Sequence, residues 1–260
     1  GLGRALGFLV GSLALGTAAP HLFAAQDQIN WQQVMLIVAL LNLVSGLVVL
    51  LGVSEGPNQL KPAPVRLSQI GGLLKEQKLR ASALGYFGHM WELYAIWAIA
   101  PIWLSVWASY HQLDLNISLA SFAIIAIGAL GCTLGGIWSQ SIGSARIASL
   151  MLKISGGCCL LSPLIFEMNG LITSIFWAIW GFSIVADSPQ FSALSAQNAP
   201  ADALGTSLTL INAIGFSLTL IAIQLSVTLM QWLPVEWIPL VLMPGPLLGV
   251  MAMRPLTKCR

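Results

Sequence analysis

Three ionisable residues of this chain stand inside long apolar stretches, where charged side chains are rare. His89 and Glu92 lie three residues apart, so in a helix they share one face. Asp187 lies in a separate apolar stretch. Ionisable groups at membrane depth are energetically expensive, and they mark substrate paths and proton relays. The three residues could therefore bind a cation, carry a proton or hold polar groups of a substrate.

The positions of these residues along their helices predict that they meet. At about 1.5 Å per residue, Glu92 lies roughly 16 Å from one membrane surface, and Asp187 lies roughly 10–12 Å from the same surface. If the two helices are neighbours, a carboxylate–imidazole–carboxylate cluster lines one cavity. We expect five further side chains to line that cavity: Tyr86, Trp97, Ser183, Gln190 and Asn212.

Structural roles stay open for the same residues. His89 could simply satisfy Glu92, and Asp187 could pair with Lys153 from the adjoining apolar stretch. The sequence favours a cavity for Asp187, because a polar stripe wider than one ion pair runs along its helix: Ser183, Asp187 and Gln190.

The elements that position these residues are eight apolar stretches of roughly 20 residues, the length that crosses a hydrocarbon core of about 30 Å. With 57% hydrophobic and 8% charged residues, the chain is not a soluble globular protein. We therefore predict an all-α membrane protein, a polytopic bundle of eight transmembrane helices. The predicted spans are 3–24, 31–53, 81–107, 117–138, 147–166, 170–194, 204–229 and 233–253.

The basic residues all fall on one side of this layout, if the long stem of Lys153 reaches that side from within its span. The others are Arg4, Lys61, Arg66, Lys75, Lys78, Arg80, Arg146, Arg254, Lys258 and Arg260, and the opposite side carries Asp27, Asp114, Glu167 and Glu236. Short loops rich in Lys and Arg stay in the cytoplasm, so both termini of this chain are predicted to be cytoplasmic. Four tryptophans are expected to form an interfacial belt on the outer side: Trp31, Trp107, Trp232 and Trp237.

One long polar connection, residues 54–80, divides the chain into segments 1–53 and 81–260. Apolar residues at helical spacing over 67–74 predict a short interfacial helix within it. The chain opens without Met, and Arg4 stands directly before an apolar run, so we expect a fragment of a longer protein.

Enzymatic, metal-binding and nucleic-acid-binding functions find little support. The sequence carries no zinc-protease motif, no Ser-His-Asp arrangement at one depth and no phosphate-binding loop. We predict no enzymatic activity, no cofactor, no metal and no nucleic-acid partner. Three cysteines inside spans are expected to pack as small apolar groups: Cys132, Cys158 and Cys159. The expected partners are the lipid bilayer and a small-molecule or ion substrate, and we expect a monomer.

Two segments resemble a known family. Gly-His-Met-Trp-Glu-Leu-Tyr at 88–94 and Ala-Asp-Ser-Pro-Gln-Phe at 186–191 resemble major facilitator superfamily transporters, in a bacterial branch loosely labelled nitrate/nitrite transporter. The resemblance covers the last eight of that fold's twelve helices, a partial major facilitator fold. It implies that 1–53 holds the last two helices of the N-terminal half, that 54–80 is the cytoplasmic connection, and that 81–260 is the six-helix C-terminal half. The third and sixth spans would then be the fold's seventh and tenth helices, which line its central cavity.

The chain departs from the family pattern at two places. The loop between Gly136 and Arg146 has Gln140 and Ser141 where the superfamily signature has Asp-Arg. Apart from Arg4 at the very start of the first span, no arginine lies within a predicted span, and buried acids repel an anion, which argues against nitrate as the substrate.

The function that these residues predict is secondary active transport of a small solute across a bacterial inner membrane by alternating access. We expect proton coupling, with the proton on Glu92, His89 tuning it and Asp187 as a second carboxylate. Two alternatives stay open: an uncoupled facilitator, and a transport-incompetent membrane scaffold or sensor whose buried charges are structural.

Overall fold

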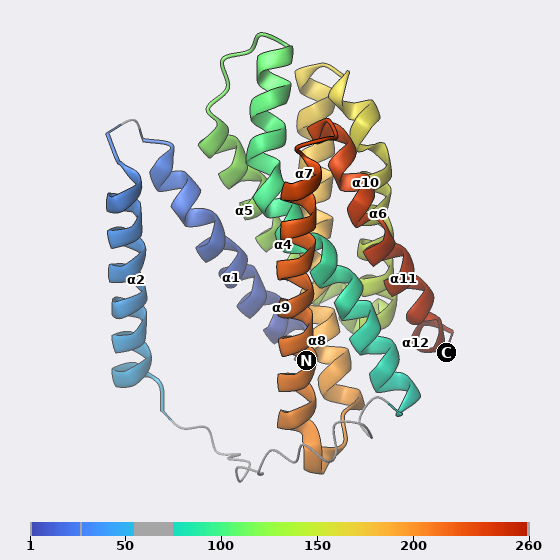
Figure 1. Ribbon diagram of the computed structural model, residues 1–260. Coiled ribbons are helices and arrows are strands. Elements are labelled where there is room, and N and C mark those ends of the chain that lie inside the picture. Colours follow the sequence, from blue (N-terminus) through green and yellow to red (C-terminus); the bar gives the residue numbers. More distant parts are fainter. Residues whose placement is uncertain (1, 27, 55–74, 259–260) are drawn as a thin grey trace.

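The computed structural model describes residues 2–26, 28–54 and 75–258, and within these ranges the chain forms a bundle of helices (Figure 1). The helices are α1 (Leu2–Ala24), α2 (Trp31–Gly52), α4 (Gln77–Tyr110), α5 (Ile117–Ile142), α6 (Ser144–Phe166), α7 (Gly170–Ala186), α8 (Ser188–Asn198), α9 (Leu204–Leu229), α10 (Ile238–Leu242), α11 (Pro244–Ala252) and α12 (Arg254–Thr257). Two short 3-10 turns, Ala201–Ala203 and Val235–Trp237, precede α9 and α10.

The predicted all-α membrane architecture is confirmed. Eight candidate spans are long and apolar enough to cross a bilayer, and they match the eight stretches expected from the sequence. The third span is longer than predicted, since α4 covers 34 residues. The sixth and eighth spans are each interrupted, the sixth between α7 and α8 and the eighth between α10 and α11. The expected interfacial helix over 67–74 lies outside the described residues.

Asparagine residues fix the starts of three spans. The side chains of Asn30, Asn116 and Asn169 each accept a hydrogen bond from a backbone N–H in the first turn of α2, α5 and α7. Such N-caps satisfy donors that a helix cannot pair internally. Because these three helices start at their caps, their boundaries agree with the sequence-based ones.

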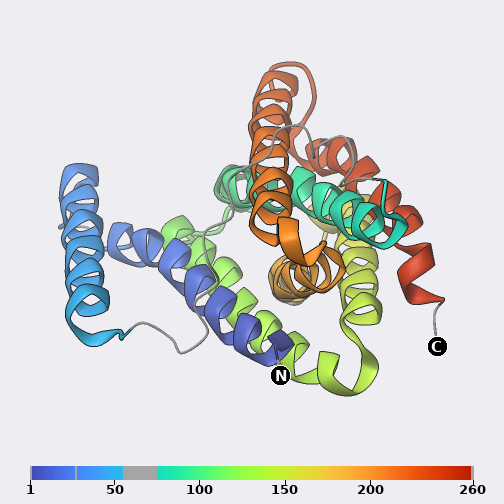
Figure 2. The same cartoon turned by 90° about the horizontal axis from the view of Figure 1, so that it is seen from below.

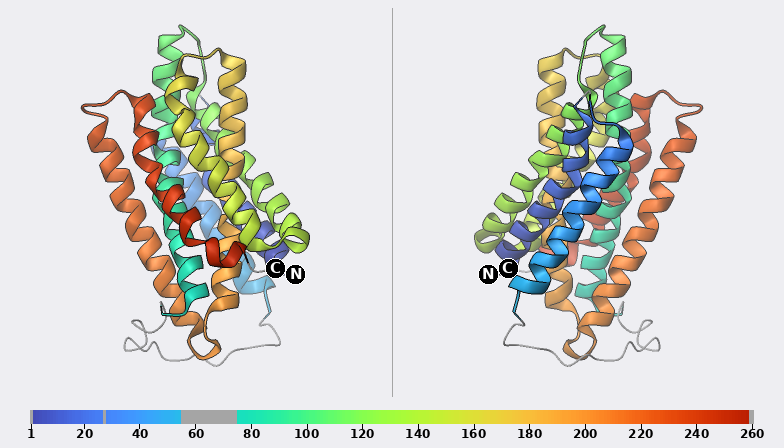
Figure 3. Two further views of the ribbon diagram at one scale, coloured as in Figure 1. Left: turned by 90° about the vertical axis from the view of Figure 1, so that its right-hand side faces the viewer. Right: turned by 90° about the vertical axis from the view of Figure 1, so that its left-hand side faces the viewer.

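Successive spans run antiparallel, so their connections alternate between the two ends of the bundle (Figure 3). Basic and acidic residues are divided between these two ends. We call the end where α4, α6 and α9 begin the basic end, because its described charges include Arg4, Lys75, Lys78, Arg80, Arg146, Arg254 and Lys258. We call the opposite end the acidic end, after Asp114, Glu167 and Glu236. There the Tyr110 hydroxyl donates to Glu167 Oε2 over 3.0 Å and ties α4 to the end of α6.

Helix α1 packs along α5 at very short range. A Cβ atom added to Gly7 would lie 2.6 Å from the carbonyl oxygen of Cys132 and 3.1 Å from Cα of Gly136. Only glycine allows the two backbones to approach so closely. Helix α2 touches α1 and otherwise stands at the edge of the bundle (Figures 1 and 2). The segment before the long connection is therefore joined to the rest mainly through α1.

The tryptophan belt is only partly as predicted. Trp31, Trp232 and Trp237 are exposed, as interfacial residues should be. Trp107 is only 4% exposed and was wrongly placed in the belt. Helix α4 continues past it to Tyr110, and its ring packs against Trp103 and His111 in the core.

Candidate functional site

Asp187 occupies the break between α7 and α8. Pro189 follows two residues later and has no N–H, so it cannot donate to the carbonyl of Val185 as the next helical turn would. The Cys132 thiol from α5 lies 3.2 Å from that carbonyl oxygen and donates to it. Cys132 therefore does more than fill space, which is the role that the sequence suggested. The break leaves Asp187 at the N-terminus of α8, where the helix dipole favours a negative charge.

His89, on α4, bridges the two residues at this break. Its Nδ1 lies 2.8 Å from Asp187 Oδ1, and both side chains are about 1% exposed. Its Nε2 lies 2.7 Å from the half-buried Ser188 hydroxyl. An imidazole with a polar partner on each nitrogen can accept a proton at one nitrogen and release it from the other. The arrangement is therefore suited to proton transfer along α4 and α8.

Glu92 lies one helical turn from His89, and its described hydrogen bonds go elsewhere. Its Oε1 accepts from Trp180 Nε1 at 3.0 Å, from Cys159 Sγ at 3.3 Å and from the Ser155 hydroxyl. These donors come from α6 and α7, and Glu92 itself is 1% exposed. Three donors on one oxygen stabilise a buried carboxylate that would otherwise be very costly.

The expected cluster therefore forms as two neighbouring groups. His89 contacts Asp187, while Glu92 has its own set of donors. Lys153, the other partner considered for Asp187, is exposed and lines a groove between α6 and α11. The described contacts of Asp187 thus match the interpretation in which His89, rather than Lys153, faces it.

A small pocket, which we call the inner pocket, lies beside His89. It has a volume of about 180 Å³, and it is lined by residues of α1, α4, α8 and α9: Leu2, Leu6, Tyr86, Phe191, Ser192, Ser195, Ala196, Leu208, Ile211 and Asn212. The rings of Tyr86 and Phe191 lie 6.0 and 5.8 Å from the imidazole of His89, between centroids. Two of the expected cavity residues, Tyr86 and Asn212, thus line one pocket.

The other three expected cavity residues are placed differently. Trp97 is buried in the main hydrophobic cluster, with its ring edge-on to Tyr94. Ser183 donates to the Trp180 carbonyl of its own helix and borders a shallow groove formed with Ile127 and Met151. Gln190 is fully buried, and its amide has no hydrogen-bond partner among the described residues.

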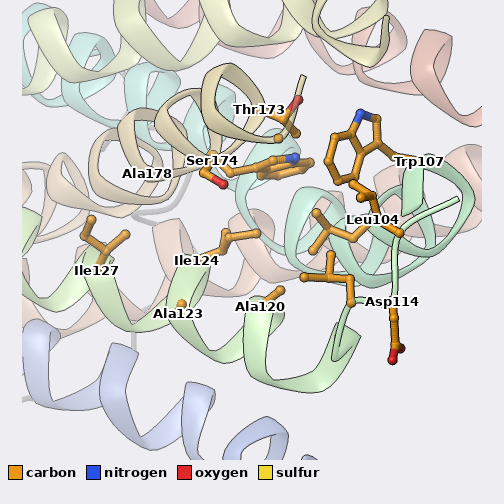
Figure 4. A pocket seen from close by; sticks show the side chains of 14 residues that line it. Leu104, Trp107, Asp114, Ala120, Ala123, Ile124, Ile127, Thr173, Ser174 and Ala178 are labelled. Atoms are coloured by element: carbon orange, nitrogen blue, oxygen red, sulfur yellow. The ribbon is translucent and has the colours of Figure 1, made fainter. Parts of the chain in front are cut away.

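A larger apolar pocket, which we call the outer pocket, opens among α4, α5 and α7 toward the acidic end. Its volume is about 480 Å³, and Figure 4 shows α4 residues Leu104 and Trp107 across from the α5 side chains Ala120 and Ile124. Trp177 also lines this pocket, and its ring stacks on Trp180 with 5.0 Å between centroids. Because Trp180 donates to Glu92, the two stacked tryptophan rings lie between the outer pocket and that carboxylate.

Comparison with known proteins identifies the family. The model of the Major Facilitator Superfamily matches residues 1–223, which include α1 to α8 and most of α9. The chain belongs to the major facilitator superfamily. Members of this superfamily are membrane transporters, so the prediction of a membrane transporter is confirmed. No curated protein matches the chain.

Sequence reasoning missed several contacts in this major facilitator chain. Ser155 and Cys159 lie four residues apart on α6, and this small polar face was a usable signal for a partner of Glu92. Trp180 is one of ten tryptophans, and its spacing did not mark it. Among the described residues, no group of three or more His, Cys, Asp or Glu side chains is arranged to hold a metal ion.

Proposed function

We propose that this chain works in proton-coupled secondary transport of a small solute across the inner membrane of a bacterium, by alternating access. The basic end would face the cytoplasm, in keeping with the preference of Lys-rich and Arg-rich loops. The observation that carries the proposal is the full burial of Glu92 and Asp187, both about 1% exposed or less, inside the helical bundle. Buried acids in membrane helices are expensive to keep and commonly serve transport.

The two carboxylates, those of Glu92 and Asp187, would bind the proton one after the other on its way through the bundle. Glu92 lies behind the stacked rings of Trp180 and Trp177, which separate it from the outer pocket, so these rings must move apart for a proton to reach it from there. Asp187 and His89 lie beside Tyr86 and Phe191 at the inner pocket. A proton that reaches Glu92 from the acidic end would pass to Asp187 and His89 and leave through the inner pocket when the halves rock. The family resemblance supports this path, since it aligns α4 and α7–α8 with helices that line the central cavity.

The same groups constrain the solute. Carboxylates that lose and regain protons near the path repel an anion during half of the cycle. The inner pocket offers hydroxyl and amide groups from Ser192, Ser195 and Asn212, with an otherwise apolar and aromatic lining. A small neutral or cationic solute with polar groups fits this lining better than nitrate does.

The test is uptake by the protein, expressed from its complete reading frame and reconstituted in liposomes, with and without an imposed proton gradient. Small neutral and cationic solutes are first screened for thermal stabilisation of the purified protein. Glu92→Gln keeps the shape of the side chain but cannot titrate. It should abolish gradient-driven accumulation of the identified solute while counterflow exchange continues.

The matched control is Glu167→Gln, which makes the same chemical change at the acidic end, away from the path. It should accumulate solute like the wild type. Accumulation by Glu92→Gln with the wild-type dependence on pH would remove Glu92 from coupling. Uptake by the wild type that ignores the gradient would identify an uncoupled facilitator, and the absence of any uptake would favour a scaffold or sensor.

A further inference from the structure

Lys153 is a cation without an assigned role, well inside a membrane span. It lies nine residues after Ser144, the first residue of α6, which places its Cα roughly 13 Å along the helix. The side chain is exposed, and no hydrogen bond or ion pair to it is found among the described residues. The long stem of such a lysine carries its ammonium toward the polar region at the membrane surface, and the described chain supplies no partner for it there.

The surroundings of Lys153 form a groove between α6 and α11. The groove has a volume of about 200 Å³, and its lining is otherwise apolar: Leu152, Gly156, Gly157, Leu160, Met243, Pro246, Leu247 and Val250. Gly156 lets Pro246 approach, since a Cβ there would lie 2.8 Å from the proline ring. Gly157 instead has open space around it and lies one turn beyond Lys153 on the same face. The missing side chain at 157 leaves room for a long apolar group.

The ammonium group of Lys153 is directed toward the basic end. Side chains in a helix tilt toward its N-terminus, and α6 begins at the basic end. Arg146 is exposed. It lies seven residues before Lys153, about two helical turns away, on nearly the same face of α6. Helix α12, which starts at the exposed Arg254, contacts α6. Lys153 thus lines the groove, and two further exposed cations, Arg146 and Arg254, stand toward the basic end on the same helix and on a helix in contact with it.

We propose that this groove binds an anionic phospholipid. Its phosphate would pair with the ammonium group of Lys153, and one of its acyl chains would fill the space beside Gly157. Arg146 and Arg254 would hold the rest of the headgroup. A zwitterionic phosphatidylethanolamine fits less well, because its own ammonium would face these cations and none of the described lining residues is acidic. Figure 2 shows α6 and α11 on the side of the bundle away from α1 and α2, so the groove faces outward.

The binding is tested on the purified protein in mixed micelles by thermal unfolding with added lipid. Phosphatidylglycerol should raise the melting temperature of the wild type by several degrees more than the same mole fraction of phosphatidylethanolamine. Lys153→Met should lose at least half of this difference, and Lys153→Arg should retain it. Gly157→Leu keeps the charge but fills the groove, and it should also lose at least half.

The matched control is Lys78→Met, which removes another exposed lysine of the basic end, at the start of α4. It should keep the full preference for phosphatidylglycerol. Equal stabilisation by phosphatidylglycerol of the wild type, Lys153→Met and Gly157→Leu would overturn the proposal. So would equal effects of the two lipids, or full stabilisation by soluble glycerol phosphate, which would show a phosphate site without a lipid. Transport does not enter the measurement, so the result is independent of the proposed function.

Discussion

At the scale of single residues, the two buried acids, Glu92 and Asp187, differ in the side chains that contact them. His89 links Asp187 to Ser188, whereas Glu92 is held by donors from α6 and α7. Glu92 Oε1 has three donors, whereas the described contact of Asp187 is the His89 imidazole at Oδ1, and its Oδ2 has no hydrogen-bond partner among the described residues. The energetic consequence is that Asp187 should be coupled to His89 and nearly independent of Lys153.

A double-mutant cycle measures this coupling. Asp187→Asn and His89→Phe, singly and together, should give a coupling free energy of roughly 0.5–3 kcal/mol, as for other residues in contact. Removal of only one partner of a buried pair strands the other and costs about 3–5 kcal/mol when that partner stays charged. The measurement is unfolding of each variant in detergent.

The matched cycle replaces His89→Phe by Lys153→Met. Lys153→Met alone should leave the free energy of unfolding in lipid-free detergent almost unchanged. Its coupling free energy with Asp187→Asn should stay within about 0.5 kcal/mol of zero. A coupling above about 2 kcal/mol would instead assign Asp187 to an ion pair with Lys153 and contradict the observed contact with His89.

At the scale of elements, the contact between α1 and α5 depends on the absence of a side chain. A methyl group on Gly7 would press on the Cys132 carbonyl at 2.6 Å, while one on Gly16 of the same helix would meet nothing within 4 Å. Gly7→Ala should therefore destabilise the protein by about 1–3 kcal/mol, the usual cost of overpacking.

Gly16→Ala is the control, because it changes the same residue type in the same helix on an open face. It should be neutral or slightly stabilising, since alanine is the better helix former by about 1 kcal/mol. Thermal unfolding in detergent compares the two variants. Equal melting temperatures would mean that α1 does not pack on α5 as closely as described.

The spans themselves were predictable because their signal is local. An apolar run of the right length must form a helix in a bilayer, whatever surrounds it. The break at Asp187 was less visible, although Pro189 is the residue that forces it. Its consequence, the donation from Cys132 to the Val185 carbonyl, depends on which helix lies alongside, and spacing along one helix carries no such information.

The candidate site was predictable to the same extent. Burial of charge marked His89, Glu92 and Asp187, because their cost is a property of the residue and its depth. Their partners depend on rotation and contact between helices. The spacing of Ser155 and Cys159 marks a small polar face on α6, but that this face and Trp180 of α7 meet Glu92, and that His89 lies against Asp187, depends on how the helices pack.

At the scale of the whole molecule, the separation of charge between the two ends predicts the orientation in the membrane. The described acids at the acidic end are Asp114, Glu167 and Glu236, and the described bases cluster at the other end or point toward it. Transfer of several basic groups across a membrane is costly, so the basic end should remain in the cytoplasm.

Labelling of single cysteines in intact cells tests this orientation. Gln231→Cys lies exposed at the acidic end, and Lys258→Cys lies exposed at the basic end; both are made with Cys259 replaced by serine. Cys132, Cys158 and Cys159 are buried and can stay in place. A membrane-impermeant maleimide should label Gln231→Cys and leave Lys258→Cys unmodified until the cells are permeabilised, when both should react. Labelling of Lys258→Cys from outside, with Gln231→Cys protected, would invert the orientation, and the proton path would then run from the inner pocket toward the outer one.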